Sequence, residues 1–200
     1  MNAPTLADRP ETWPYRRTGT TPGILMDFVV DEVTAPDGGM MTRNYLEHLD
    51  SVGIIAMDAH HRIAIEHQYR HPVRRVLVEA PAGLRDEPGE AALATAQREL
   101  AEEAGLQAAR WQVLVDIYAT PGASSQATRI FLARDLSPVP RPEGFVLAGE
   151  EAAMTLGWAG LDDLVEAIYA GTVMNPTLVA GVMALYAAVL AGRLDDLRPA

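Results

Sequence analysis

The stretch that most constrains the fold is a run without glycine or proline that follows Pro88-Gly89 and ends at Gly105. Pro-Gly is a turn signal, and the run is dominated by Ala, Leu, Gln, Arg and Glu, which are strong helix formers. A glycine directly after such a run is typical of a left-handed helix cap. The stretch therefore predicts a helix over residues 90–104, with a turn before it and a cap at Gly105.

The predicted helix has an apolar stripe and an acidic flank. At about 100° per residue, one stripe carries the side chains that we expect to face the core, namely Leu93, Ala96, Gln97, Leu100 and Ala104. Glu99, Glu102 and Glu103 lie beside it. Carboxylates this close repel one another, and a cation would relieve the repulsion. Oxygen ligands on a rigid element suit Mg²⁺ or Mn²⁺, while a solvated acidic face is the plainer interpretation.

The spacing along this stretch resembles the Nudix box, Gly-x5-Glu-x7-Arg-Glu-(apolar)-x-Glu-Glu-x-Gly-(apolar). The matching residues are Glu90, Arg98-Glu99-Leu100, Glu102-Glu103 and Gly105-Leu106. One departure is an extra residue between Gly83 and Glu90, which gives Gly-x6-Glu. On this motif the chain is identified as a member of the Nudix hydrolase superfamily.

Flanking segments narrow the resemblance to the ADP-ribose pyrophosphatase branch. They are Gln68-Tyr69-Arg70, Glu79-Ala80-Pro81-Ala82-Gly83, Thr120-Pro121-Gly122-Ala123-Ser124-Ser125 and residues 171–176. The branch reads roughly Gln-(aromatic)-Arg, Glu-x-Pro-Ala-Gly and Ser-Pro-Gly-x-Ser at these places. The resemblance covers nearly all of residues 51–190. It implies an α+β fold, a Nudix α/β/α sandwich with a mixed β-sheet, plus a small N-terminal β-sheet appendage.

The resemblance also implies the metal site. Glu99 and Glu103 match the metal-binding glutamates of the family, and Glu102 beside them is implied as a further ligand or base. The backbone carbonyl of Ala82 falls where the branch supplies another metal oxygen. The expected cofactor is Mg²⁺ or Mn²⁺, which would neutralise phosphate oxygens and orient the attacking water.

The other implied roles concern substrate and structure. Arg70 matches the arginine that contacts the substrate's phosphates, and a guanidinium can fork two phosphate oxygens. Glu79 and Gly122 lie in the segments expected to bind substrate with it. The resemblance also implies structural roles for four motif residues: Gly83, Glu90, Arg98 and Gly105. Among these, Glu90 and Arg98 are expected to join the loop to the helix.

The general base is the open question in the implied mechanism. The Pro-Gly-x-Ser loop of the branch usually continues to a glutamate, and here that position holds Gln126, whose amide cannot act as a base. In related enzymes a glutamate on a later loop is often the base. Glu150 and Glu151 are therefore the candidates, and two solvated loop glutamates are the alternative interpretation.

The implied activity is hydrolysis of ADP-ribose or a related nucleoside diphosphate sugar to a nucleoside monophosphate and a sugar phosphate. One alternative is another Nudix substrate, such as a dinucleoside polyphosphate, because the box builds the metal site and not the base pocket. The other is a sensor that binds a nucleotide sugar without catalysis. Intact glutamates at 99, 102 and 103 favour an enzyme, while Gln126 and the extra loop residue depart from the pattern of the catalytic branch.

Composition narrows the partners. A net charge of −11 argues against binding to a nucleic-acid backbone. Cysteine is absent, which excludes disulfides, and the histidines offer no complete zinc-ligand set. No signal peptide is seen, and the apolar run at residues 178–190 is too short to span a bilayer. We expect a cytoplasmic protein that contacts neither membrane nor nucleic acid.

Turn signals divide the rest of the chain. The expected parts are an extended arm at residues 1–22, a hairpin subdomain at 23–49, the hydrolase domain at 50–192 and a tail at 193–200. Strands are expected at 24–33, 40–49, 51–58, 62–68, 76–79, 111–119, 128–133 and 154–158. Helices are expected at 161–169 and from Pro176 to 190, the latter capped by Asn175. A hairpin with exposed edges fits the homodimer that the branch often forms.

Overall fold

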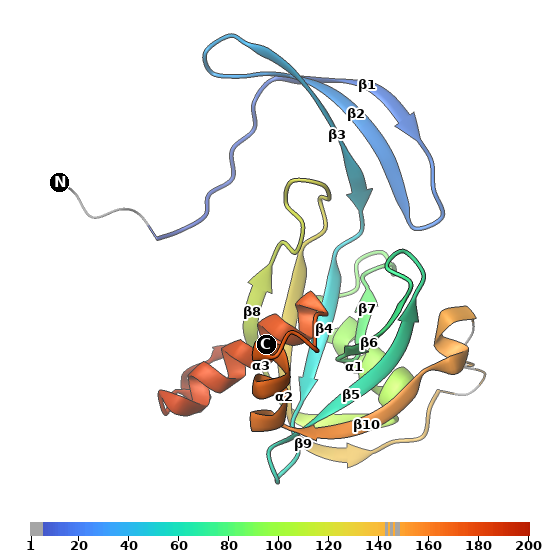
Figure 1. Cartoon of the computed structure of the whole chain (residues 1–200), viewed down its shortest axis with the longest axis vertical. Coiled ribbons are helices and arrows are strands. Elements are labelled where there is room, and N and C mark those ends of the chain that lie inside the picture. The colour runs from blue at the N-terminus through green and yellow to red at the C-terminus, as the bar shows by residue number, and fades with distance from the viewer. Residues whose placement is uncertain (1–5, 143, 145, 147–148) are drawn as a thin grey trace, which may run out of the picture. The chain divides into compact units, whose positions relative to one another are not determined.

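The computed structural model describes residues 6–142, 144, 146 and 149–200, and their contacts form two units (Figure 1). One unit holds the described residues up to His48 together with Gly122–Ser125. The other holds Leu49–Pro121 and the described part of Gln126–Ala200. The fold is therefore a mixed α+β unit with a separate small β unit, in agreement with the fold class expected from sequence.

The N-terminal unit is an antiparallel sheet of three strands: β1 (Tyr15–Thr21), β2 (Met26–Thr34) and β3 (Met40–His48). The predicted hairpin is β2 and β3. The structure adds β1, which lies within the stretch expected to be an arm, because its backbone pairs with β2 from Tyr15↔Val33 to Thr21↔Phe28. This pairing joins residues on opposite sides of a turn, so the polar composition of β1 did not reveal it.

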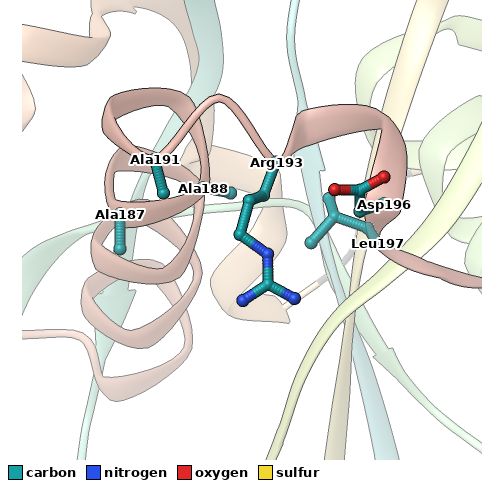
Figure 2. A pocket seen from close by; sticks show the side chains of 6 residues that line it. All are labelled: Ala187, Ala188, Ala191, Arg193, Asp196 and Leu197. Carbon is teal, nitrogen blue, oxygen red and sulfur yellow. The ribbon is translucent and has the colours of Figure 1, made fainter.

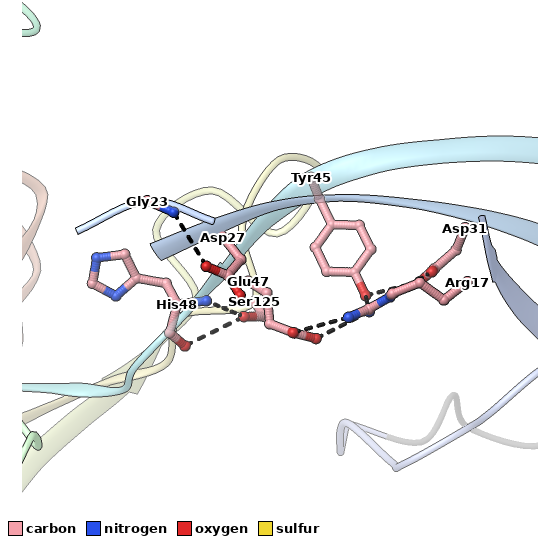
Figure 3. Close-up of polar contacts among 8 residues, drawn as sticks. All are labelled: Arg17, Gly23, Asp27, Asp31, Tyr45, Glu47, His48 and Ser125. Carbon is pink, nitrogen blue, oxygen red and sulfur yellow. Dashed lines mark hydrogen bonds and ion pairs between the residues drawn. The ribbon is translucent and has the colours of Figure 1, made fainter. Parts of the chain in front are cut away.

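Arg17 ties the three strands together (Figure 3). Its guanidinium donates to Asp31 on β2 at 2.9 Å and to Glu47 on β3 at 2.9 Å. The Tyr45 hydroxyl donates to the second carboxylate oxygen of Asp31 at 3.0 Å. Asp31 is 4% exposed, and the hydrogen bonds from Arg17 hold its pKa below the ordinary value of 3.8. A buried carboxylate is stable here because it stays charged and paired.

The loop Gly122–Ser125 belongs to the same unit as β3. Leu46 donates its amide to Ala123 at 2.9 Å, and Ser125 donates its amide back to Leu46 at 3.0 Å. The Ser125 hydroxyl accepts from the amide of His48 at 3.0 Å (Figure 3). The loop therefore continues the hydrogen bonding of β3, although its sequence neighbours on both sides belong to the larger unit.

The larger unit contains two sheets. A sheet of five strands has the order β11 (Arg198–Pro199), β8 (Leu106–Ile117), β9 (Thr128–Pro138), β4 (Ser51–Ala56) and β7 (Ala82–Leu84). It is mixed, because β4 and β9 are parallel and the other neighbours are antiparallel. A sheet of three antiparallel strands has the order β10 (Thr155–Gly160), β5 (Arg62–Arg70) and β6 (Arg75–Glu79).

Helices pack on both sides of these strands, which gives the expected α/β/α layers. Alternate residues of β4 supply two separate cores, since successive side chains of a strand point to opposite faces. Ile54 packs in the core that includes Leu100 of α1 (Ala92–Ala104). Ile55 packs in the core that includes residues of α2 (Leu161–Tyr169) and α3 (Pro176–Leu190). A short 3₁₀ segment, Gly149–Ala153, precedes β10, and another, Leu194–Asp196, precedes β11.

The two strands that follow α1 are longer in the structure than the sequence predicts. β8 begins directly after Gly105, not at Trp111, and β9 continues past Ala133 to Pro138. The two strands are antiparallel partners from Leu106↔Pro138 onward, so each supplies the hydrogen bonds that extend the other. The tail also joins the sheet, because Arg198 pairs with Val113.

The final helix matches its prediction in both limits and cap. Asn175 precedes Pro176, and its side-chain oxygen accepts from the amide of Leu178 at 3.0 Å. Gly181 lies inside the helix, where it packs closely against Ile55. A Cβ added to Gly181 would lie 2.5 Å from Ile55 Cγ1, which is too close for a side chain without a shift of the helix or of Ile55. In the described part of the chain, no helix combines the length and apolarity needed to cross a membrane.

The cap of α3 allows a direct test. Asn175→Ala removes the oxygen that accepts from Leu178, and we expect it to lower the free energy of unfolding by about 1 kcal/mol. Asn175→Asp keeps an acceptor and should restore most of the loss. Urea denaturation followed by circular dichroism measures both variants. An alanine variant as stable as the unaltered protein would show that this hydrogen bond adds nothing to the helix.

Candidate active site

Arg98 is the centre of an acidic cluster on α1 and the loop before it. Its Nη1 lies 2.8 Å from Glu99 Oε1 and 3.1 Å from Glu102 Oε2. Its Nη2 lies 3.5 Å from both Glu90 Oε2 and Asp86 Oδ1. One guanidinium therefore faces four carboxylates. This arrangement offsets the repulsion expected along the acidic flank.

Glu90 links the loop to the helix through two contacts. Its carboxylate accepts from Thr95 Oγ1 at 2.8 Å and pairs with Arg98. The helix itself begins at Ala92, after a backbone cap at Ala91 that has no side-chain hydrogen bond. Glu90 thus stands just before the helix and bonds to side chains of its first turns.

Glu99 is held against a glycine of β7. A Cβ added to Gly83 would lie 2.0 Å from Glu99 Oε1 and 2.1 Å from its carboxyl carbon. A side chain at this position would require the carboxylate of Glu99 to move. Burial raises the pKa of Glu99 to about 7 from 4.5, although the adjacent Arg98 lowers it. Glu99 is therefore a carboxylate whose charge is poorly solvated.

Glu103 is buried and faces β7. Its Oε2 accepts from the amide of Ala82 at 2.9 Å, and its side chain is among the buried polar groups at 6% exposure. Arg141, from the segment after β9, donates to the backbone oxygen of Glu103 at 2.8 Å. These contacts explain why Glu103 is buried. Gln97, which we expected on the core face, is exposed instead. A glutamate can be buried when a hydrogen-bond donor, here the amide of Ala82, faces its carboxylate.

Arg70 and Glu79 form a second charged pair on the sheet of three strands. Arg70 Nη2 lies 2.7 Å from Glu79 Oε2, and its Nε lies 3.1 Å from Glu79 Oε1. Glu79 is 3% exposed, so the pair is buried on the carboxylate side. Hydrogen bonding to Glu79 raises the pKa of Arg70, and the nearby charges of Glu103 and Glu150 add to this effect. Glu79 ends β6 shortly before Ala82, whose amide contacts Glu103 on α1, so the Arg70–Glu79 pair lies near the acidic helix flank.

Both candidates for the general base lie in the 3₁₀ segment before β10. Glu150 Oε1 accepts from the amide of His71, next to Arg70, at 3.2 Å. Glu151 follows in the same 3₁₀ segment, and its side chain lies outside the described part of the structure. Gln126 donates its amide to the Leu49 carbonyl at 3.1 Å. Gly122, expected to bind substrate, belongs to the N-terminal unit, and its role stays a prediction.

Sequence reasoning missed two members of the site. Asp86, in the loop that carries the extra residue, reaches Arg98, and Arg141 reaches the backbone of α1. Asp86 was detectable as an additional acid in the box loop. Arg141 was not, because its contact joins residues 38 positions apart through the end of β9.

The oxygen donors of this cluster fit a hard divalent cation by chemistry. Glu99 and Glu103 both face β7, one beside Gly83 and one at the amide of Ala82. Across residues 6–142, 144, 146 and 149–200, no three His, Asp or Glu side chains already converge on a common metal position. Glu99 and Glu102 instead point to Arg98. A cation would compete with this guanidinium for the same oxygens.

Two cavities lie away from this cluster. One of about 370 Å³ is found at the end of α3 (Figure 2) and is lined by Ala187, Ala188, Ala191, Arg193, Asp196 and Leu197. The other, of about 290 Å³, includes Met57, His61 and Arg134 in its lining. Neither contains a predicted site residue. We therefore place the candidate active site at the charged cluster between α1, β7 and the β5–β6 hairpin.

The contact between Gly83 and Glu99 predicts a specific loss of stability. Gly83→Ala forces the carboxylate to move, and we expect the free energy of unfolding to fall by about 1–3 kcal/mol. Gly157→Ala is the matched control, because its new Cβ would meet Ile65 at an ordinary 3.7 Å.

Chemical denaturation measures the two variants and the pair Gly83→Ala with Glu99→Ala. The combined change should be smaller than the sum of the single changes, because truncating Glu99 removes the clash. Additive losses would contradict the contact.

Comparisons with known proteins show which family the chain resembles. The chain matches the NUDIX domain family over residues 47–176. It is 45% identical to an ADP-ribose pyrophosphatase of Mycobacterium tuberculosis over 165 residues, which is 82% of this chain and 78% of the relative. It is 35% identical to an ADP-ribose pyrophosphatase of Bacillus subtilis over 115 residues, 58% of this chain and 62% of the relative.

A solved structure described as an ADP compounds hydrolase shares the fold, with a TM-score of 0.72 at 18% identity. The match covers 92% of this chain and 100% of that structure. At this identity it supports the architecture alone. Together with the family match over most of the chain and the relative at 45% identity, these observations show that the chain belongs to the Nudix family and is an ADP-ribose pyrophosphatase-like hydrolase of pyrophosphate bonds.

Proposed function

We propose that the protein is a Mg²⁺- or Mn²⁺-dependent pyrophosphohydrolase of ADP-ribose or a related nucleoside diphosphate sugar. The observation that carries the proposal is the placement of Glu99, Glu102 and Glu103 on one flank of α1, close to the Arg70–Glu79 pair. Carboxylates are suitable ligands for a divalent cation, and a guanidinium is a suitable partner for phosphate oxygens. The site therefore combines the two kinds of group that binding a diphosphate with its metal ion requires. The named substrate of the relative from Mycobacterium tuberculosis supports ADP-ribose.

In the proposed reaction a water oxygen attacks one phosphorus of the diphosphate, and the bond to the bridging oxygen breaks. The bridging oxygen leaves with the second phosphate, and the water's protons pass to a base and to solvent. ADP-ribose would yield AMP and ribose 5-phosphate. A bound divalent ion would neutralise the diphosphate oxygens and orient the water. Glu99, Glu102 and Glu103 would hold that ion, with the carbonyl of Ala82 as a further proposed ligand.

The remaining residues would position the substrate and the proton acceptor. Arg70 would bind phosphate oxygens, and buried Glu79 keeps its guanidinium in place through two hydrogen bonds. Glu150 is the proposed base, because it already lies beside the hairpin that carries Arg70. Glu151 is the second candidate. Gln126 donates to a backbone carbonyl, which agrees with a structural role for this amide.

Three further properties complete the proposal. We expect a cytoplasmic enzyme with a small-molecule substrate that binds neither nucleic acid nor membrane, in keeping with the net charge of −11. We also propose a homodimer. The N-terminal sheet supports it with large exposed apolar side chains on β2 and β3, including Phe28, Met40 and Leu46. Such a sheet is a suitable surface for a second copy.

The substrate proposal is tested with a panel of nucleoside diphosphate derivatives and Mg²⁺ or Mn²⁺. We expect ADP-ribose to be hydrolysed, with AMP detected by chromatography. Glu103→Gln keeps the size of the side chain and should reduce turnover about a hundredfold or more, because it removes a carboxylate from the site. Faster turnover of a dinucleoside polyphosphate would identify that compound, and not ADP-ribose, as the preferred substrate. Tight binding without turnover would identify a sensor.

The base proposal is tested by Glu150→Gln. We expect kcat to fall by about 10²–10⁴ with little change in KM, because a general base acts in the transition state. Glu166→Gln, on the exposed side of α2, is a matched control for the loss of one charge. Undiminished kcat in Glu150→Gln would exclude Glu150 as the base, and Glu151→Gln would then be measured.

A further inference from the structure

The β5–β6 hairpin places two arginines directly opposite each other. Arg70 and Arg75 are register partners at the end of the hairpin, and Glu66 and Glu79 are partners further along the same two strands. Partners that face each other across an antiparallel pair point to the same side of the sheet, with Cβ atoms about 4.5–5.5 Å apart. Arg75 therefore shares a face with both Arg70 and Glu79.

The two arginines differ in how their charges are balanced. Arg70 is bound to the carboxylate of Glu79 at 2.7 Å. Arg75 is exposed, and it forms no ion pair or side-chain hydrogen bond with any residue that the structure describes. Most arginines in the described part of the chain do form ion pairs. An unpaired arginine opposite another arginine is therefore unusual in this protein.

This arrangement works against the stability of the free protein. Like charges placed directly opposite in a sheet destabilise the strand pairing. An anion bound at this end of the hairpin would offset the unpaired charge of Arg75 and could also accept hydrogen bonds from Arg70. The overall charge of −11 repels anionic ligands in general, so a local pair of guanidinium groups is the means to hold one.

We propose that Arg75 binds the diphosphate of the substrate beside Arg70, as a second guanidinium on the same face of the hairpin. The inference rests on the proposed function and adds to it a residue that neither the Nudix box nor the flanking motifs contain. Each guanidinium can fork two oxygens, so two neighbouring arginines match two neighbouring phosphoryl groups. Arg75 is then a binding residue that acts on substrate affinity.

The test uses calorimetric titration with the non-hydrolysable α,β-methylene analogue of ADP-ribose in the presence of Mg²⁺. Arg75→Gln should weaken the affinity roughly tenfold, the usual effect of losing one hydrogen-bonded charge. Arg193→Gln is the matched control. It removes an exposed arginine at the end of α3 whose side chain also lacks a partner among the described residues (Figure 2). Its affinity should equal that of the unaltered protein.

A second readout separates binding from a structural role. Because Arg75 opposes Arg70, Arg75→Gln should leave the melting temperature of the free protein unchanged or raise it. A lowered melting temperature together with unchanged affinity would assign Arg75 to the structure and overturn the inference. Kinetics should show a higher KM for ADP-ribose with a similar kcat.

The outcomes distinguish the inference from the proposed function. Unchanged affinity in Arg75→Gln, or an equal loss in Arg193→Gln, overturns the role of Arg75 while hydrolysis by the unaltered protein stands. If the unaltered protein binds the analogue without hydrolysing ADP-ribose, the proposed catalytic function is overturned. A tenfold loss of affinity in Arg75→Gln still supports the binding role of Arg75 in that case. Absence of binding by the unaltered protein overturns both.

Discussion

The interaction on which this site depends is the contact of one guanidinium with the acidic flank of α1. Arg98 faces Glu90, Glu99, Glu102 and Asp86 at 2.8–3.5 Å. Without it, several carboxylates would be packed together at partial burial, which is unfavourable both by repulsion and by loss of hydration. Arg98 therefore lets the protein fold with a concentrated negative charge already assembled. The same charge is what a divalent cation can use.

Two neighbouring residues of β7 set the position of this flank. Gly83 leaves room for the carboxylate of Glu99, and Ala82 donates its amide to Glu103. On its other side α1 buries Ala96 and Leu100 in the core that it shares with β4. The rotation of the helix is thus determined both by apolar packing and by polar contacts. A glycine, a backbone amide and two glutamates act as one unit, although only part of it lies in the box.

The positive side of the site comes from the β5–β6 hairpin, where Arg70 is held by buried Glu79. The negative helix flank and the positive hairpin suit the two needs of a diphosphate, since carboxylates are suitable ligands for a divalent cation and a guanidinium is a suitable partner for phosphate oxygens. The N-terminal unit has its own charged centre at Arg17. It also includes the Gly122–Ser125 loop, which is hydrogen-bonded to β3. A segment expected to bind substrate therefore belongs to the N-terminal unit and not to the larger unit.

Local signals in the sequence determined the helices and the family. The cap at Gly105, the limits of α2 and the Asn175-Pro176 start of α3 depend on neighbouring residues, and each agrees with the structure. The box spacing predicted the acidic flank for the same reason. Tertiary structure alone decided β1, the full length of β8 and β9, the burial of Glu103, and the contact of Arg141 with α1. It also placed Arg75 opposite Arg70. These features are pairings between distant segments, and a strand or a buried charge is stable only when its partner is present.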